Sequence, residues 1–163
     1  MPDWRIAGNG RSRGLQVKLV DVNILLYATN DQYPNHSIAR KWLDDHLNGE
    51  EPLALPWETL LGFVRIAANP RLFRPCLTVM EAWTQVADWL ASPCVWMPTE
   101  TARHADFLEK IFSSTPMTSA LVPDAQLAAF ALEYGLTVVS ADTDFQLFAG
   151  VGVRVENPFL QRK

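Results

Sequence analysis

The chain has 163 residues, of which 48% are hydrophobic and 20% are charged, and its formal net charge at pH 7 is −4. This composition excludes a disordered chain, and the length suits one domain with a substantial core. The net negative charge argues against a protein that coats nucleic acid by charge alone, but it is compatible with an acidic metal site that handles phosphates. No apolar stretch approaches the roughly 18 residues of a membrane span.

Residues 1–16 contain glycines and arginines and lack the continuous apolar region of a secretory signal. We interpret them as a flexible arm or an over-extended start, and we expect a single domain over residues 17–160. Cys76 and Cys94 do not have the spacing of a metal site. Without a signal peptide they are expected to be reduced thiols of a cytoplasmic protein.

The segment LVDVNILLY, residues 19–27, is the first predicted element. We interpret it as a short buried strand that carries Asp21 at its C-terminal end, where open α/β sheets place their sites. Residues 29–34 form a polar break. Apolar residues then recur at helical spacing over residues 38–47, which predicts a helix.

A second short strand is expected over residues 53–55. Pro56 favours the first turn of a helix over residues 57–68, because its missing N–H would have no partner there. The helix stops at Asn69-Pro70, since a residue before proline avoids the helical region.

Thr78 and Glu81 match a capping box, which predicts a helix that ends at Ser92-Pro93. Residues 95–97 suit a strand, and residues 101–112 have the apolar spacing of another helix.

A loop is expected over residues 113–122, followed by a helix that starts at Pro123 and ends at Gly135. Residues 136–139 and 151–155 are apolar runs that suit two last strands. Strands and helices therefore alternate, and the strands lack period-two alternation, which is typical of a buried parallel sheet. With right-handed crossovers, this pattern predicts an α/β fold, a three-layer α/β/α sandwich with a short central parallel sheet.

Acidic residues stand at the ends of these predicted elements. Asp21 ends the first strand, Glu58 and Asp124 lie in first turns of helices, and Asp142 follows a late strand, with Asp144 two residues later. In a parallel sheet, the C-termini of the strands and the N-termini of the following helices share one edge, so these side chains can meet.

Each acid also has a purely structural interpretation. Acids in a first helical turn are favoured by the helix dipole and by capping, so Glu58 and Asp124, taken singly, are more often caps than ligands. Asp144 also suits a solvated turn. Together, however, several carboxylates at one edge would repel and raise one another's pKa. A divalent cation relieves that repulsion, and oxygen ligands alone suit Mg²⁺ or Mn²⁺ rather than Zn²⁺.

Carboxylate-bound Mg²⁺ commonly serves phosphate-ester chemistry, in which the metal orients the phosphate and lowers the pKa of a bound water that attacks it. No glycine-rich phosphate loop, Ser-His-Asp arrangement or nucleotide fingerprint competes with this interpretation. The histidines His36, His46 and His104 lack metal-pair spacing and are interpreted as surface or helix-face residues. Trp42, Trp83 and Trp89 are expected in the core.

Four segments of the chain carry a family resemblance: VKLVDVNILLY, LPWETLLGFVRIAANPRLF, LVPDAQLAAFALEYG and SADTDFQLFAGVGVRVENP. They span about residues 17–158 and resemble the PIN domain. Within that family, the chain is similar to the VapC toxins of type II VapBC toxin–antitoxin modules, in the mycobacterial subgroup. No motif is specific alone, but the ordered set D-x-N, E, DAxLAA and S-x-D-x-DF is.

The resemblance implies a Mg²⁺-dependent endoribonuclease that cleaves structured RNA, such as tRNA or rRNA, by metal-activated water and thereby inhibits translation. It also implies a cognate VapB-type antitoxin that blocks the site, and a homodimer. Residues 1–16 depart from the family, whose members usually start just before the first strand.

By motif position, Asp21 and Asp124 are the principal expected metal ligands. Glu58 and Asp142 complete a catalytic quartet, in which Asp142 is also expected to bind metal, and Asp144 is an accessory acid.

Three polar residues have expected supporting roles. Asn23 and Ser140 lie where the family has polar residues that brace the ligands. Arg65 lies two helical turns after Glu58. It either holds an RNA phosphate or orients an acid, or it forms an ion pair on its own helix face, and the spacing does not decide between these roles.

Two other classes of protein share part of this pattern. A catalytically silent PIN-like module would bind RNA or protein without turnover, but the presence of all four acids counts against it. A phosphoacceptor receiver domain also gathers acids around Mg²⁺. It would need paired acids near the first strand and a late lysine, whereas this chain has a single Asp21 there and no lysine between Lys110 and Lys163.

Overall fold

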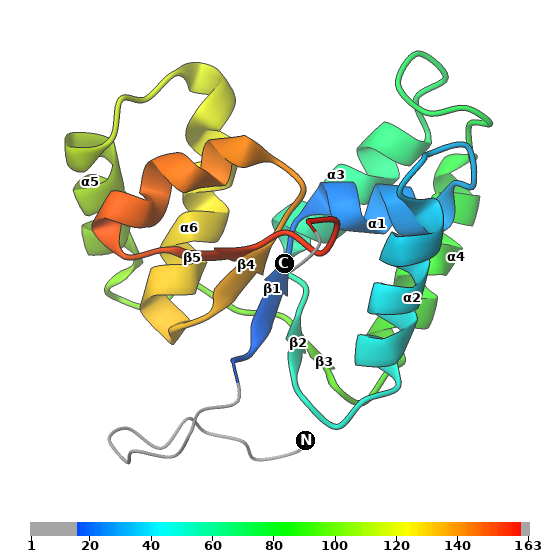
Figure 1. Ribbon diagram of the computed structural model, residues 1–163, viewed down its shortest axis with the longest axis horizontal. Coiled ribbons are helices and arrows are strands. Elements are labelled where there is room, and N and C mark those ends of the chain that lie inside the picture. The colour runs from blue at the N-terminus through cyan, green and yellow to red at the C-terminus, as the bar shows by residue number, and fades with distance from the viewer. Residues whose placement is uncertain (1–15, 161–163) are drawn as a thin grey trace.

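The structure is a computed structural model that describes residues 16–160, so the predicted arm lies outside the described residues except for Gln16. A sheet of five parallel strands forms its centre, in the order β3-β2-β1-β4-β5 (Figure 1). The strands are β1 (Lys18–Val20), β2 (Leu53–Ala54), β3 (Val95–Trp96), β4 (Thr137–Val139) and β5 (Arg154–Glu156).

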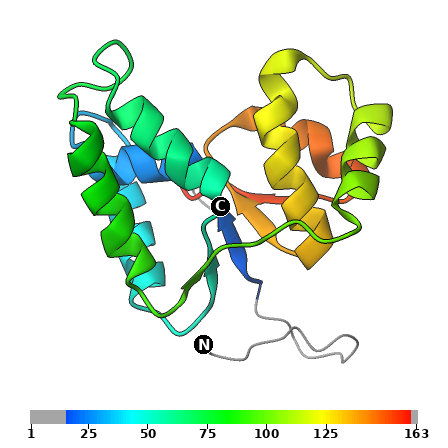
Figure 2. The ribbon, with the colours of Figure 1, turned by 180° about the vertical axis from the view of Figure 1, so that it is seen from behind.

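Helices connect the strands and cover both faces of the sheet (Figures 1 and 2). They are α1 (Val22–Thr29), α2 (His36–Leu47), α3 (Trp57–Ala67), α4 (Val79–Leu90), α5 (His104–Ser114), α6 (Val122–Tyr134) and the 3-10 helices η1 (Ser119–Leu121) and η2 (Thr143–Val151). None of the helices within residues 16–160 is long and apolar enough to cross a membrane.

The short strands divide their side chains between two hydrophobic cores. Val20 and Val139 pack with α1 to α4, whereas Leu19 and Val138 pack with α5, α6 and η2. Neighbouring residues of a strand point to opposite faces, so two consecutive apolar residues can supply both cores. This arrangement confirms the predicted three-layer α/β/α sandwich, in which β1 is the central strand.

The segment LVDVNILLY is not a continuous strand, and this part of the prediction is wrong. The strand ends at Val20, and α1 begins at Val22, with Asp21 as its N-cap. Ile24, Leu25 and Ala28 are buried at helical spacing, so the apolar run packs as one face of a helix.

The predicted start of α4 and the predicted end of α6 are confirmed. Thr78 and Glu81 form both hydrogen bonds of the capping box that starts α4. Gly135 ends α6 in the left-handed conformation, with φ 69°, which glycine adopts without the steric cost of a Cβ atom. The last strand, however, begins at Arg154 rather than at Val151, because the preceding residues form η2 and bury Phe148.

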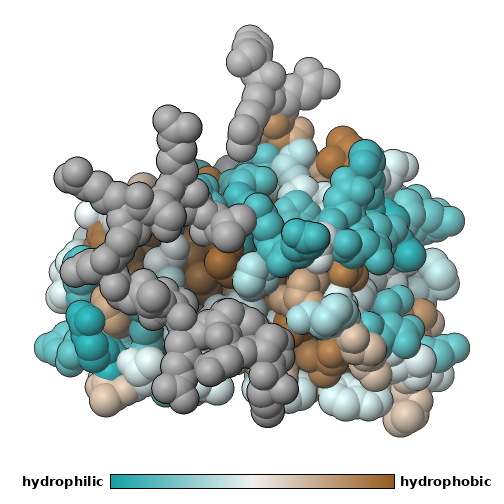
Figure 3. All heavy atoms as spheres, turned by 90° about the horizontal axis from the view of Figure 1, so that it is seen from below, coloured by the Kyte–Doolittle hydropathy of each residue, from teal (hydrophilic) through white to brown (hydrophobic). Residues whose placement is uncertain are grey.

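The tryptophans only partly follow the prediction of core positions. Trp89 is buried against Phe63, and Trp42 is partly buried and stacks on His46 at 3.9 Å between ring centroids. Trp83 is 38% exposed on α4, so its predicted core position is wrong. Seen from below, the surface of the described residues mixes hydrophilic and hydrophobic patches (Figure 3).

Candidate functional site

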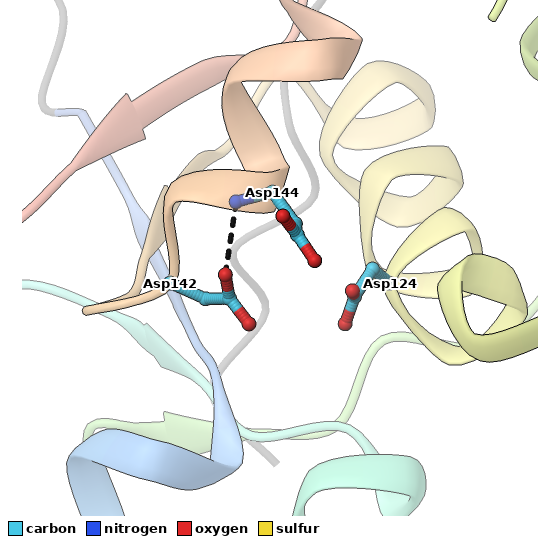
Figure 4. Close-up of side chains that lie close together, drawn as sticks. All are labelled: Asp124, Asp142 and Asp144. Atoms are coloured by element: carbon cyan, nitrogen blue, oxygen red, sulfur yellow. Dashed lines mark hydrogen bonds between the residues drawn. The ribbon is translucent and has the colours of Figure 1, made fainter. Parts of the chain in front are cut away.

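Three aspartates meet where α6 and η2 begin. One carboxylate oxygen from each of Asp124, Asp142 and Asp144 lies within 4.8 Å of the others, and Figure 4 shows the three side chains converging. Asp124 lies in the first turn of α6. Asp142 caps η2 by accepting a hydrogen bond from the backbone N–H of Asp144 at 2.9 Å. We call these three residues the acidic cluster.

The charge of Asp124 is poorly compensated within the protein. Its pKa is raised to about 7, first because the carboxyl group is partly buried and then because of the negative charges of Asp21, Asp142 and Asp144. Within residues 16–160, no group donates a hydrogen bond to this carboxylate. A cation placed among these oxygens would offset both the burial and the repulsion.

Asp21 stands beside the acidic cluster in a very different environment. It is 6% exposed, and its Oδ1 atom accepts a hydrogen bond from the Val22 N–H at 2.6 Å. Its Oδ2 atom accepts from Asn23 Nδ2 at 2.7 Å and from Ser140 Oγ at 2.6 Å. Burial raises the pKa of Asp21, these hydrogen bonds oppose the rise, and the charge of Asp142 adds to it. We call the three donors the Asp21 cradle.

Ser140 joins the cradle to the acidic cluster. Its fully buried hydroxyl donates to Asp21 and accepts from Asn23 Nδ2 at 3.0 Å and from the Asp142 N–H at 2.9 Å. Asn23 Oδ1 in turn accepts from the Ala141 N–H at 3.1 Å. These bonds fix the chain after β4 against the start of α1, which places Asp142 beside Asp21. Asn23 and Ser140 thus both donate to Asp21, and their role in bracing metal ligands stays a prediction.

Glu58, the fourth acid expected at the site, lies in the first turn of α3. Next to it, buried Thr59 donates a hydrogen bond to the Val20 carbonyl at 2.8 Å, which anchors the first turn of α3 to the end of β1. Glu58 is exposed and accepts a hydrogen bond from Gln126 Nε2 at 3.3 Å. Arg65 is also exposed, and it makes no hydrogen bond or ion pair with another residue in the described range.

The expected metal ligands and the members of the acidic cluster are therefore only partly the same residues. Asp124 and Asp142 belong to the acidic cluster, but its third member is Asp144, which was expected as an accessory acid. Asp21 lies outside this trio, although its charge acts on Asp124. A direct ligand role for Asp21 stays a prediction.

The sequence interpretation missed a buried polar group at the start of α5. His104 is 7% exposed, so its interpretation as a surface or helix-face residue is wrong. Both ring nitrogens have partners: Nδ1 lies 2.8 Å from Glu133 Oε2, and Nε2 lies 3.2 Å from Gln126 Oε1. The available signal was the spacing of Gln126 and Glu133, two turns apart on one face of α6.

The donor set of the acidic cluster consists of carboxylate oxygens alone. Such ligands suit hard divalent cations, and the raised pKa of Asp124 is the expected result of gathering them without a cation. The residues present therefore fit a divalent metal ion.

The chain also has clear relatives. The PIN domain family matches residues 18–151. Ribonuclease VapC37 of Mycobacterium tuberculosis is 43% identical over 135 residues, which cover 83% of this chain and 94% of that protein. Ribonuclease VapC33 of the same organism is 37% identical over 129 residues, covering 79% of this chain and 90% of that protein.

A solved structure shows the same fold at much lower identity. VapBC2 from Rickettsia felis, bound to a DNA fragment from its promoter, matches with a TM-score of 0.62 and 12% identity over 86% of this chain and 98% of that chain. The family match and the extent of identity to the curated relatives show that the chain belongs to the PIN-domain family and, within it, to the VapC ribonucleases.

Proposed function

We propose that this chain is the toxin of a VapBC toxin–antitoxin pair and a Mg²⁺-dependent endoribonuclease that cleaves structured RNA. The observation that carries the proposal is the acidic cluster beside buried Asp21, with the pKa of Asp124 raised to about 7. A site that crowds negative charge in this way suits a protein that binds a cation during its reaction.

The proposed ligands of Mg²⁺, or of Mn²⁺ in its place, are Asp124 and Asp142, with Asp144 as the nearest third carboxylate and Asp21 as their neighbour. When bound, the ion supplies charge neutralisation and Lewis-acid activation for hydrolysis of a phosphodiester. The Asp21 cradle keeps the Asp21 carboxylate in a fixed direction, and Glu58, on α3, is proposed as a fifth acid of the site. Arg65 is then available to contact an RNA phosphate.

Membership of the VapC ribonucleases supports our proposals on the substrate and the partners. We propose tRNA or rRNA as the substrate class, inhibition of translation as the cellular effect, and the cytoplasm as the location. A VapB-type antitoxin would cover the site, and the toxin would form a homodimer. The related Rickettsia felis structure is of VapBC2. Exposed apolar residues on α2 and α3, namely Ile38, Trp57 and Leu61, provide surface for such contacts.

The proposed reaction is tested by Asp124→Asn, which keeps the shape of the side chain and removes its charge. We expect RNA cleavage in Mg²⁺ to fall at least about 100-fold, equivalent to about 2.7 kcal/mol of barrier, and growth arrest on induction to disappear. Asp106→Asn is the matched control, because Asp106 is an exposed acid in the first turn of α5. It should cleave like the unmodified protein.

Three results would contradict the proposal. Cleavage by Asp124→Asn at the unmodified rate would remove Asp124 from the reaction. RNA binding without products, in Mg²⁺ or Mn²⁺, would favour a silent binding module instead. Sequencing of RNA ends after brief induction identifies the RNA that is cut, and unchanged tRNA and rRNA ends would refute the proposed substrate class.

A further inference from the structure

A chain of polar contacts runs from a buried ion pair to Glu58. The side chains of Glu133 and His104 are 4% and 9% exposed, and they pair at 2.8 Å. His104 Nε2 contacts Gln126 Oε1 at 3.2 Å. Gln126 Nε2 in turn faces two acids, Glu58 Oε1 at 3.3 Å and Glu100 Oε1 at 3.4 Å. The contacts join α3, α5, α6 and the segment before α5.

The chemistry of these groups sets the direction of each hydrogen bond. Ionised carboxylates only accept, so the NH₂ end of Gln126 must face Glu58 and Glu100. Its carbonyl end then faces His104, whose Nε2 must donate. The other ring nitrogen faces Glu133, another acceptor. His104 therefore donates from both nitrogens, which requires the imidazolium form.

The electrostatics of the ion pair agree with this assignment. Burial disfavours a charged ring, but the hydrogen bonds with Glu133 and Gln126 outweigh it and raise the pKa of His104. Burial also acts to raise the pKa of Glu133, but hydrogen bonds from Thr101 and His104 lower it overall. Phe130 packs beside the imidazole at 4.9 Å between centroids, which restricts rotation of the ring.

Gln126 is two residues after Asp124 on α6, so one rigid helix carries both an acid of the cluster and the amide that holds Glu58. Resting on the proposed function, in which Glu58 is a catalytic acid, we propose that Gln126 is a positioning residue that fixes the direction of the Glu58 carboxylate. The His104–Glu133 pair fixes the direction of its amide. An exposed glutamate otherwise has several rotamers, and a fixed partner removes that freedom before substrate arrives.

The test uses two substitutions with different effects on the buried pair. Gln126→Leu removes both hydrogen-bonding ends of the amide. Gln126→Glu keeps an acceptor for His104, and therefore keeps the tie between α5 and α6, but it removes the donor to Glu58. Both variants should lower kcat by roughly 10-fold to 100-fold, the range expected when a residue that orients a side chain of a metal site is lost, with KM for RNA within about twofold. Gln85→Leu, on α4, is the matched control and should leave kcat unchanged.

A double-mutant cycle shows whether Gln126 acts through Glu58. If it does, Gln126→Leu should add little to the loss already caused by Glu58→Gln. The Mg²⁺ concentration that gives half of the thermal stabilisation should rise in Gln126→Leu and stay unchanged in Gln85→Leu. This readout does not depend on RNA cleavage.

The outcomes separate this inference from the proposed function. Unchanged kcat in both Gln126 variants would overturn the positioning role while cleavage itself stands. So would a double variant whose fold-loss in kcat equals the product of the fold-losses of Gln126→Leu and Glu58→Gln. A melting temperature lowered in Gln126→Leu with normal kcat would show that the network only holds α5 against α6. Absence of Mg²⁺-dependent cleavage by the unmodified protein and by Gln85→Leu would overturn the proposed function and this role with it.

Discussion

Asp21 and Asp124 stand at the same edge of the sheet, but the protein treats their charges in opposite ways. Asp21 is buried, and the backbone N–H of Val22 and the side chains of Asn23 and Ser140 donate to its two oxygens. Asp124 is less buried, yet no hydrogen-bond donor within residues 16–160 reaches its carboxylate, and its neighbours are acids.

The difference separates two tasks within one site. The Asp21 cradle makes a carboxylate that keeps a fixed direction whether or not a ligand is bound. The acidic cluster is held together against its own repulsion, so its stability should depend on a cation that the protein does not itself supply. The two regions should therefore respond with opposite signs when their polar groups are removed.

Removing a donor from the Asp21 cradle should have the largest effect on stability. Ser140→Ala leaves Asp21 short of one donor and deprives Asn23 and the Asp142 N–H of an acceptor. We expect the free energy of unfolding to fall by about 1–3 kcal/mol, the cost of leaving buried polar groups unpaired. Urea unfolding of the metal-free protein measures this.

Ser37→Ala, on the exposed side of α2, is the control for that experiment. It should change the free energy of unfolding by less than about 0.5 kcal/mol. Equal free energies of unfolding for Ser140→Ala and Ser37→Ala would mean that the Asp21 cradle does not stabilise the fold.

Removing a charge from the acidic cluster should change the free energy of unfolding in the opposite direction. Without metal at pH 8, Asp124→Asn should raise the free energy of unfolding by on the order of 1 kcal/mol, because it removes a partly buried, repelled carboxylate. Thermal unfolding in a chelator measures the change. A variant less stable than the unmodified protein under these conditions would show that the carboxylate of Asp124 is satisfied after all.

The difference in stability between Asp124→Asn and the unmodified protein should depend on pH. The pKa of Asp124 is raised from 3.8 to about 7 in the folded protein, so the folded state holds a proton that the unfolded state has lost between these values. The stability that this proton provides is complete below about pH 4 and is lost as the pH rises to about 7. The stability advantage of Asp124→Asn over the unmodified protein should therefore grow from pH 4 to pH 7 and then level off. An advantage independent of pH would refute the raised pKa.

Asp144 should give the smallest change in stability. Its side chain is exposed, so Asp144→Asn should alter metal-free stability by less than about 0.5 kcal/mol. It should nevertheless raise the Mg²⁺ concentration needed for thermal stabilisation, since it removes one of three converging oxygens. An unchanged Mg²⁺ requirement would exclude Asp144 from the ion site and favour Asp21 as the third ligand.

The parts of this site that could be predicted from sequence are those fixed by chain topology. Acids at the C-terminal ends of parallel strands and in first helical turns share one edge, so the approach of Asp142 to Asp124 follows from the order of the elements. The position of Asp21 at the end of the first strand was also predicted, although that strand is only three residues long. The run after it was misread, because a short apolar segment suits a buried strand or a helix equally well.

What the sequence did not predict depends on contacts between distant segments. His104 is buried because Gln126 and Glu133, 22 and 29 residues later in the chain, satisfy its ring nitrogens. Trp83 lies at an apolar position of α4, yet it stays exposed because nothing in the described structure fully covers that side of the helix. Helical spacing defines a face, but it does not say whether another element covers it.

Mg²⁺ titration of the melting temperature at pH 7.5 shows whether the acidic cluster binds a divalent cation. The unmodified protein and Asp106→Asn should both be stabilised by millimolar Mg²⁺, because a ligand that binds only the folded state raises the melting temperature. Asp124→Asn should show little or no stabilisation. An equal rise of the melting temperature in all three proteins, or no rise in the unmodified protein, would mean that the acidic cluster is not a divalent-cation site.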